Sequence, residues 1–323
     1  MRRLFKWIIL PLLLLIALVG GNFIYGWTAA GPSTRDVTVV IKPGSSITLV
    51  AKQLEKAGII KSADAFVNRA KILGRTSTIK TGEFHIPAHA SNADILSILT
   101  GGKTVQRLVT IVEGMPSIMV HDRLMANDKL KGDVAVPAEG SVLPDSYSFE
   151  NGEPRIAVLA RMQAAMTKAL AEEWAKRSPN TVAKTPQEAV ILASIVEKET
   201  ALPEERRTVA AVYSNRVRKS MMLQADPTII YPITKGKPLG RRIRQSEISD
   251  VNDYNTYAMI GLPKGPIANP SRASIAAVLN PSDSQALFFV ANGKGGHVFA
   301  NTLEEHNANV EKWFAIRRER GEM

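Results

Sequence analysis

Residues 185–200, with the sequence TPQEAVILASIVEKET, are the stretch from which the fold and function of this chain are best predicted. Thr185, Pro186 and Glu188 supply the N-cap, the first-turn proline and the N3 glutamate of a helix start. The apolar residues that follow have the spacing of a helix, so we predict a helix through Glu199. Such a helix gives rigid support to the charged residues at its end.

Glu199 is the candidate catalytic acid of this helix. At 3.6 residues per turn it shares one face with three apolar residues, Leu192, Ile195 and Val196. Glu197 and Lys198 point elsewhere. Burial disfavours an ionised carboxylate, so the pKa of Glu199 should rise toward the range that allows proton donation near neutral pH. The alternative is an exposed Glu199, or one that pairs with Lys198 or Arg206.

Several further motifs accompany this helix. Upstream lie Glu139-Gly140 and LPDSYSF (143–149), and downstream lie LQADPTIIY (223–231), YNTY (254–257), GLPKGPIANP (261–270) and GGHVF (295–299). In this order and spacing, the set resembles the MltG (YceG-like) family of membrane-anchored endolytic murein transglycosylases. The resemblance runs from about residue 37 to about residue 313 and is weakest before residue 100.

The resemblance implies a reaction and a set of partners. In that family the catalytic acid is the second Glu of the EKE triplet, which is Glu199 here. The family cleaves the bond between N-acetylmuramic acid and N-acetylglucosamine inside peptidoglycan strands without water and leaves 1,6-anhydro ends. One carboxyl group then serves first as acid and afterwards as base. The implied partners are glycan strands and cell-wall synthesis proteins, and no cofactor is expected.

Composition limits the alternatives. A chain of 323 residues with 45% hydrophobic and 22% charged residues can form two domains with real cores. It contains no cysteine, which excludes disulfide frameworks, thiol nucleophiles and cysteine metal sites. The net charge is +11, of which +4 lies in residues 1–35. Five cations without an acid lie between Asp226 and Glu247: Lys235, Lys237, Arg241, Arg242 and Arg244.

This basic run has two interpretations. A solvated loop is the default, and a contact to an anionic partner is the alternative. Because an exported chain rarely meets nucleic acid, we expect no nucleic-acid partner and interpret the run as a contact to an anionic glycan.

The N-terminal segment predicts a membrane anchor. Residues 7–27 hold no charge and are long enough to cross a bilayer core of about 30 Å as a helix. Arg2, Arg3 and Lys6 precede the segment, so the positive-inside rule places the N-terminus in the cytoplasm and the rest outside the inner membrane, in the periplasm. The alternative is a secretory signal that is cleaved after Thr28-Ala29-Ala30.

We predict an α+β protein with a transmembrane helix, a small LysM-like subdomain and a mixed α/β catalytic domain. We assign residues 1–30 to the cytoplasmic N-terminus and transmembrane anchor, 31–103 to the linker and LysM-like subdomain, 104–184 to a connecting α/β region and 185–323 to the catalytic region. In the second region, a linker at residues 31–33 is followed by a strand at 37–41, two helices ending near Gly58 and Gly74, and a strand at 82–87. The LysM-like interpretation rests on the family resemblance, and a structural spacer is the alternative.

The later elements follow from the same signals. Helices are expected at 92–99, 154–175 and 203–219, and strands at 105–112, around Ile229 and at 287–290. Beyond residue 222, proline and glycine break the chain into loops that could form the walls of a cleft.

These loops carry the candidate substrate-binding residues, Gln224, Asp226, Tyr231, Asn255, Tyr257 and His297. Asp226 either contacts a sugar hydroxyl or caps the next turn. The amides and aromatic rings are groups that sugars bind, although aromatic residues also fill cores. His297 and His306 lack a third ligand, so no metal site is expected.

Two other function classes remain open. A hydrolase of lysozyme type would need a second carboxylate, for which Asp226 is the candidate. A non-enzymatic, LysM-bearing scaffold would bind peptidoglycan and would not need Glu199 on a buried face.

Overall fold

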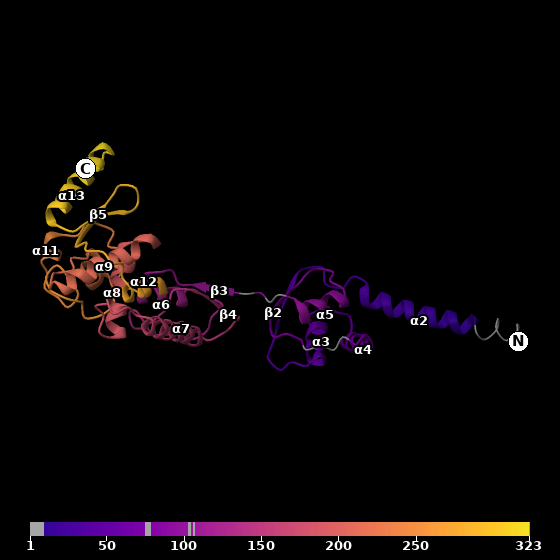
Figure 1. Cartoon of the computed structure of the whole chain (residues 1–323). Helices are drawn as coiled ribbons and strands as arrows, with labels where there is room; N and C mark the ends of the chain where they lie inside the picture. Colours follow the sequence, from indigo (N-terminus) through magenta and orange to yellow (C-terminus); the bar gives the residue numbers. More distant parts are fainter. Residues whose placement is uncertain (1–9, 75–78, 103–104, 106, 323) are drawn as a thin grey trace. The chain divides into compact units, whose positions relative to one another are not determined.

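The computed structural model describes residues 10–74, 79–102, 105 and 107–322. Its contacts divide the chain into two units, Met1–Arg107 and Leu108–Met323. Figure 1 shows that each unit consists mainly of helices and also holds a few short strands. The described residues form three two-stranded sheets. The predicted α+β class is therefore confirmed.

The first unit begins with α2 (Leu10–Thr28), a 19-residue helix. Within the described residues it is the helix that is long and apolar enough to cross a membrane, a test that a signal sequence also passes. Its leucine, isoleucine and valine side chains are exposed along most of its length. The predicted flanking residues Arg2, Arg3, Lys6 and Trp7 lie outside the described residues.

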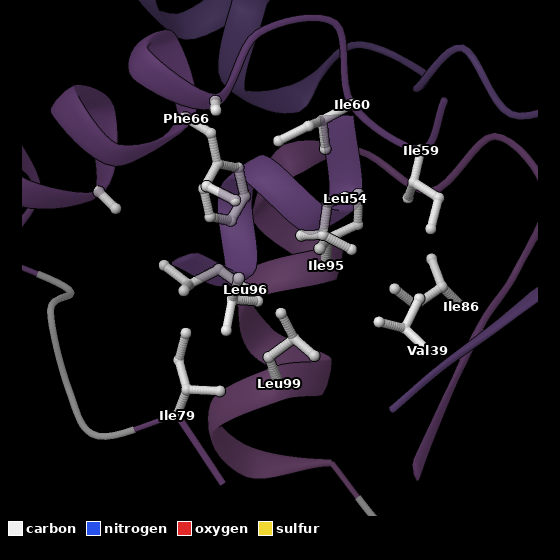
Figure 2. Packing of buried hydrophobic residues seen from close by; sticks show 14 of the residues in the cluster. Val39, Leu54, Ile59, Ile60, Phe66, Ile79, Ile86, Ile95, Leu96 and Leu99 are labelled. Carbon is white, nitrogen blue, oxygen red and sulfur yellow. The ribbon is translucent and has the colours of Figure 1, made fainter. Parts of the chain in front are cut away.

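The small subdomain has the predicted order of strand, two helices and strand. Its elements are β1 (Val37–Ile41), α3 (Ile47–Lys56), α4 (Ala63–Ile72), β2 (Gly82–Ile86) and α5 (Asn92–Gly101). β1 and β2 pair antiparallel, with Val37 opposite Ile86. Ser46 and Ser62 cap α3 and α4. Figure 2 shows the core, in which side chains from both strands and all three helices meet.

The end of α2 is fixed to this subdomain. Trp27 is 6% exposed, and its ring centroid lies 5.8 Å from that of Phe66. The side chain of Asn92 donates to the carbonyl of Gly26 at 2.9 Å. Gly31 N donates to the carbonyl of His89 at 3.1 Å. The segment predicted as a linker is thus held against the subdomain by backbone contacts.

The first elements of the second unit surround a hydrophobic core of their own. They are β3 (Arg107–Thr110), α6 (Ser117–Met125), β4 (Ser146–Phe149) and α7 (Arg155–Ala175). β3 pairs with β4. The helix predicted at 154–175 and the strand predicted within 105–112 are confirmed, and α6 was not predicted.

The remaining elements are mostly helical. They are α8 (Pro186–Glu199), α9 (Pro203–Arg218), α10 (Asp226–Thr234), α11 (Gln245–Ile248), α12 (Arg272–Leu279), β5 (Phe288–Ala291), β6 (His297–Ala300) and α13 (Leu303–Glu319). β5 and β6 form an antiparallel hairpin that α13 contacts.

α8 is the central helix of this unit. Thr185 caps it by accepting from Glu188 N at 3.1 Å, as predicted. Eight consecutive residues, 189–196, are buried, because α7, α9, α10 and α12 all pack against the helix. The spacing predicted one buried face, whereas the helix is buried on every side along these residues.

The strand predicted around Ile229 is wrong, because these residues form α10. The β-branched residues Thr228, Ile229 and Ile230 favour a strand by local preference. Pro227, however, lies in the first turn of a helix, where its missing N–H costs no hydrogen bond. Ile229 is 2% exposed, so packing in the core outweighs the local preference.

The motif at 261–270 connects distant parts of the unit. Ile267 N donates to Ser194 Oγ on α8 at 3.0 Å. The Asn269 side chain accepts from Val142 N at 3.0 Å and donates to the carbonyl of Met115 at 2.9 Å and to Ser117 Oγ at 3.0 Å. This buried segment therefore holds α8 against the start of the unit.

Candidate active site

Glu199 is the last residue of α8 and has an unusual environment. Its Oε1 atom is buried and has no hydrogen-bond partner among the described residues. Burial raises the pKa of Glu199 from 4.5 to about 7, and the nearby negative charge of Asp226 adds to this shift. The Tyr213 hydroxyl and the Arg216 charge act in the opposite direction but do not offset burial. Near neutral pH the carboxyl group can therefore both donate and accept a proton.

Tyr213 and Arg216 lie one turn apart on α9. Tyr213 is 2% exposed, and burial raises its pKa far above the usual value, so its hydroxyl stays protonated. Arg216 donates to the carbonyl of Leu287 at 2.7 Å and to the carbonyl of Leu223 at 2.9 Å. One guanidinium thus joins the loop before α10 to the start of the hairpin and places a positive charge near Glu199.

Asp226 begins α10 and is exposed. Its Oδ1 atom accepts from the Tyr257 hydroxyl at 2.6 Å. Ala225 is the N-cap of α10, without a side-chain cap, so Asp226 does not cap this helix. Burial raises the pKa of Tyr257, and the hydrogen bond to Asp226 adds to this shift. The structure thus brings together Glu199, Asp226 and Tyr257.

Gln224 borders the same group. It is exposed and has a φ of +52°, in the left-handed region that non-glycine residues rarely adopt. Two contacts hold it there, because its N–H donates to the carbonyl of Thr256 at 3.1 Å and its Oε1 accepts from Arg216 at 3.3 Å. Strained backbone of this kind is often found at functional sites.

Asn255 shapes the loop that carries Tyr257. It is fully buried, and its Nδ2 atom donates to the carbonyls of Ile248 at 2.9 Å and Asp250 at 2.6 Å. The next residue, Thr256, accepts from Ala225 N at 3.0 Å and fixes the start of α10. Asn255 therefore cannot contact a ligand directly without disrupting this loop.

Tyr231 lies on the far side of α10 from this group. It is 9% exposed, and its ring centroid lies 4.9 Å from that of Tyr254. Its hydroxyl interacts with Glu139, a carboxylate that also accepts from Ser117 N at 2.8 Å. Burial raises the pKa of Glu139 despite these bonds. Tyr231 and the partly buried Glu139 thus form a separate polar cluster.

His297 pairs with Glu205. The Nδ1 atom of His297 lies 2.7 Å from Glu205 Oε2, and its backbone N–H donates to Oε1 at 2.8 Å. Burial acts to raise the pKa of Glu205, but the hydrogen bonds from His297 outweigh it and lower the pKa. Thr200, next to Glu199, donates to the same carboxylate at 3.4 Å. His306 instead stacks on Phe288. The described residues include no group of three side chains suited to hold a metal.

Glu197 has a buried environment of its own. Its side chain is 4% exposed and accepts from Ser271 N at 2.7 Å and from Ser271 Oγ at 2.6 Å. Arg206 lies 3.9 Å away on the other side. Glu197 points away from the surroundings of Glu199, as the spacing predicted, and holds the N-cap of α12.

A cavity of about 440 Å³ opens beside the ends of α8 and α10. Its wall is largely apolar and includes three charged residues, Glu113, Lys198 and Lys237. Lys198 and Pro227 in this wall are the chain neighbours of Glu199 and Asp226, which do not line it.

Two cations of the basic run are already paired. Lys237 lies 2.8 Å from Asp122, and Arg241 pairs with Glu247. The excess positive charge of this loop is therefore smaller than the sequence alone indicates.

The arrangement around α8 can be compared with known proteins. The profile of the YceG-like family matches residues 39–312. The chain belongs to this family. The endolytic murein transglycosylase of Bacillus subtilis (strain 168) is 27% identical over 339 residues, which cover 94% of this chain and 93% of that protein.

Other YceG-like relatives differ in length. The endolytic murein transglycosylase of Streptococcus pneumoniae serotype 2 (strain D39 / NCTC 7466) is 29% identical, and the match covers 86% of this chain but 58% of that protein. A crystal structure of a putative YceG-like protein from Listeria monocytogenes is 27% identical, with a TM-score of 0.55 over 85% of this chain and 99% of that one.

Two residues of this YceG-like site were missed as site residues in the sequence. Tyr213 and Arg216 lie within the helix predicted at 203–219, but neither was predicted as a site residue. A charged residue among Val209, Val212 and Val217 was the available signal, since a buried arginine needs partners.

Proposed function

We propose that this chain is a membrane-anchored endolytic lytic transglycosylase of peptidoglycan, with Glu199 as its catalytic residue. The observation that carries the proposal is the buried carboxyl group with a pKa of about 7 and one unsatisfied oxygen. The two named relatives, both endolytic murein transglycosylases, support the same substrate.

The reaction needs one carboxyl group. Protonated Glu199 gives its proton to the glycosidic oxygen as the bond from C1 of N-acetylmuramic acid to that oxygen breaks. The muramyl 6-hydroxyl oxygen then bonds to C1 and loses its proton to the Glu199 carboxylate. The products are a new N-acetylglucosamine end and a 1,6-anhydro end, and Glu199 is again protonated. No water is consumed, because the 6-hydroxyl is held near C1 within the same sugar.

We assign different roles to the other predicted residues. Gln224, Asp226 and Tyr257 border Glu199 from exposed or half-buried positions and would contact the sugar. Asn255, Tyr231 and His297 are engaged in contacts that hold the surrounding loops and would act as positioning residues.

A hydrolase with Asp226 as second carboxylate is the competing reaction. Asp226 is close enough for its charge to raise the pKa of Glu199, which is the observation in its favour. Digestion of purified sacculi in heavy-oxygen water, followed by mass spectrometry, separates the two. The proposal expects anhydromuramyl ends without label. Reducing muramyl ends with the label at C1 would instead establish hydrolysis.

The location follows from α2. We propose that α2 remains in the inner membrane as a single span and that the chain after α2 lies outside the cytoplasm, where cell-wall synthesis proteins would be partners. We also propose that the strand-helix-helix-strand subdomain is LysM-like and binds glycan, on the strength of its element order.

A further inference from the structure

A second cavity lies where α2 joins the small subdomain. Its volume is about 320 Å³, and it is lined by α2, the segment 29–32, the start and middle of α4, and Asn92. Among the twelve described residues of its wall, the charged ones are Lys61 and Arg69, and both are cations. No carboxylate lies in that wall, so the cavity has a one-sided charge.

Arg69 is held against the backbone of α2. A Cβ atom at Gly26 would lie 2.3 Å from Arg69 Nη2, so the guanidinium packs directly against the backbone at Gly26. The guanidinium also lies 5.9 Å from the centre of the Phe23 ring. No ion pair is formed by Arg69 or Lys61 within the described residues. Both cations are therefore available to an external anion.

The position of this cavity along α2 matters. Most residues of α2 up to Tyr25 expose apolar or aromatic side chains, whereas Trp27 is buried in the subdomain. Asn22, Tyr25 and Gly26 of α2 line the cavity. If α2 spans the bilayer, this is the level of the lipid headgroups, where tyrosine and tryptophan are enriched.

We propose that this cavity binds the phosphate of an anionic membrane lipid through Lys61 and Arg69. The inference rests on the anchored location in the proposed function. A guanidinium can bind two phosphate oxygens at once, and an ammonium adds a point charge. The phosphate could belong to a glycerophospholipid or to the diphosphate of a lipid-linked glycan, and both sources share this chemistry.

The test uses the full-length protein in detergent and native mass spectrometry. Short-chain phosphatidylglycerol, short-chain phosphatidylcholine, farnesyl diphosphate and inorganic phosphate serve as separate probes. We expect phosphatidylglycerol or farnesyl diphosphate to bind more tightly than phosphatidylcholine. Lys61→Gln and Arg69→Gln should each weaken that binding about fivefold. Arg69→Lys should weaken it less, because the charge is retained. Tighter binding of the diphosphate would identify the lipid-linked glycan as the source.

Lys71→Gln is the matched control, since Lys71 is an exposed cation of α4 that does not line the cavity. The inference is overturned if this variant weakens binding as much, if the cavity variants bind like the wild type, or if phosphatidylcholine binds equally well. Inorganic phosphate that binds as tightly as the lipids would also overturn it.

Glycan cleavage, measured on the same detergent samples, separates this inference from the proposed function. Cleavage should be unchanged in the Lys61 and Arg69 variants, because neither residue belongs to the unit that holds Glu199. If Glu199→Gln leaves cleavage intact, the proposed reaction fails while the lipid measurements stand. Recovery of a processed protein without α2 would refute the anchor itself.

Discussion

Replacing Glu199 with Gln should nearly abolish cleavage and make the protein more stable at alkaline pH. The pKa of Glu199 is raised from 4.5 to about 7 in the folded protein, mainly by burial. The folded state therefore binds this proton more tightly than the unfolded chain. The resulting stability is fully present below pH 4.5 and is lost as the pH rises through about 7. A shift of this size corresponds to at most about 3 kcal/mol.

Glutamine carries no titratable proton, so the variant avoids this loss. Denaturant unfolding should give similar stabilities for the wild type and Glu199→Gln near pH 4.5, and the variant should gain up to about 3 kcal/mol above pH 7. Cleavage should fall by about 10²- to 10⁴-fold at every pH. Glu204→Gln is the control, because Glu204 is exposed. A constant stability difference across this pH range would refute the buried, proton-binding role of Glu199.

Three further predictions concern the same unit and the anchor. Asp226 raises the pKa of Glu199 and Tyr213 lowers it. Asp226→Asn should therefore move the alkaline limb of the cleavage-pH profile to lower pH, and Tyr213→Phe should move it to higher pH. Shifts of the same sign in both variants would contradict this assignment. Glu197→Ala should lower the unfolding free energy by about 2–3 kcal/mol, because the contacts with Ser271 are lost. Cleavage per folded molecule should be nearly unchanged. If this variant lowers turnover more than Glu199→Gln does, the assignment of the acid is reversed. A reporter fused after Met323 should be active only when exported and should stay in the membrane fraction at full length, whereas a mature form beginning near residue 30 would identify a cleaved signal.

The sequence was sufficient wherever local signals agree with packing. The helix from Thr185 to Glu199 has a cap, a first-turn proline and an apolar run that all indicate the same element. The strand at 37–41 is a β-branched run that ends at a turn, and it was found for the same reason, whereas the strand at 82–86 was predicted with only Phe84 and Ile86 as strand-favouring residues. At Ile229 the local preference and the packing disagree, and packing prevails.

The contacts of the candidate site were less accessible from sequence. Its hydrogen bonds join residues far apart in the chain, such as Tyr257 to Asp226 and Glu197 to Ser271. Helical periodicity can identify Glu199, but it cannot show that the side chain of Asn255 is hydrogen-bonded within its own loop. Residue type suggested sugar contacts for both Asn255 and Tyr257, and only burial separates the two.

The contacts of the 261–270 segment have a consequence for the order of folding. Ile267 forms a hydrogen bond with Ser194, and Asn269 forms hydrogen bonds with Met115, Ser117 and Val142. The hydrogen bonds of Asn269 join residues that lie 127 to 154 positions apart in the chain. Because the chain is synthesised from the N-terminus onward, these hydrogen bonds cannot form until residue 269 has been added. Because α12, which packs against α8, comes later still, an incomplete chain would carry Glu199 without the full burial that raises its pKa. We therefore expect Glu199 to lack its raised pKa until the segment 261–270 and α12 have been synthesised.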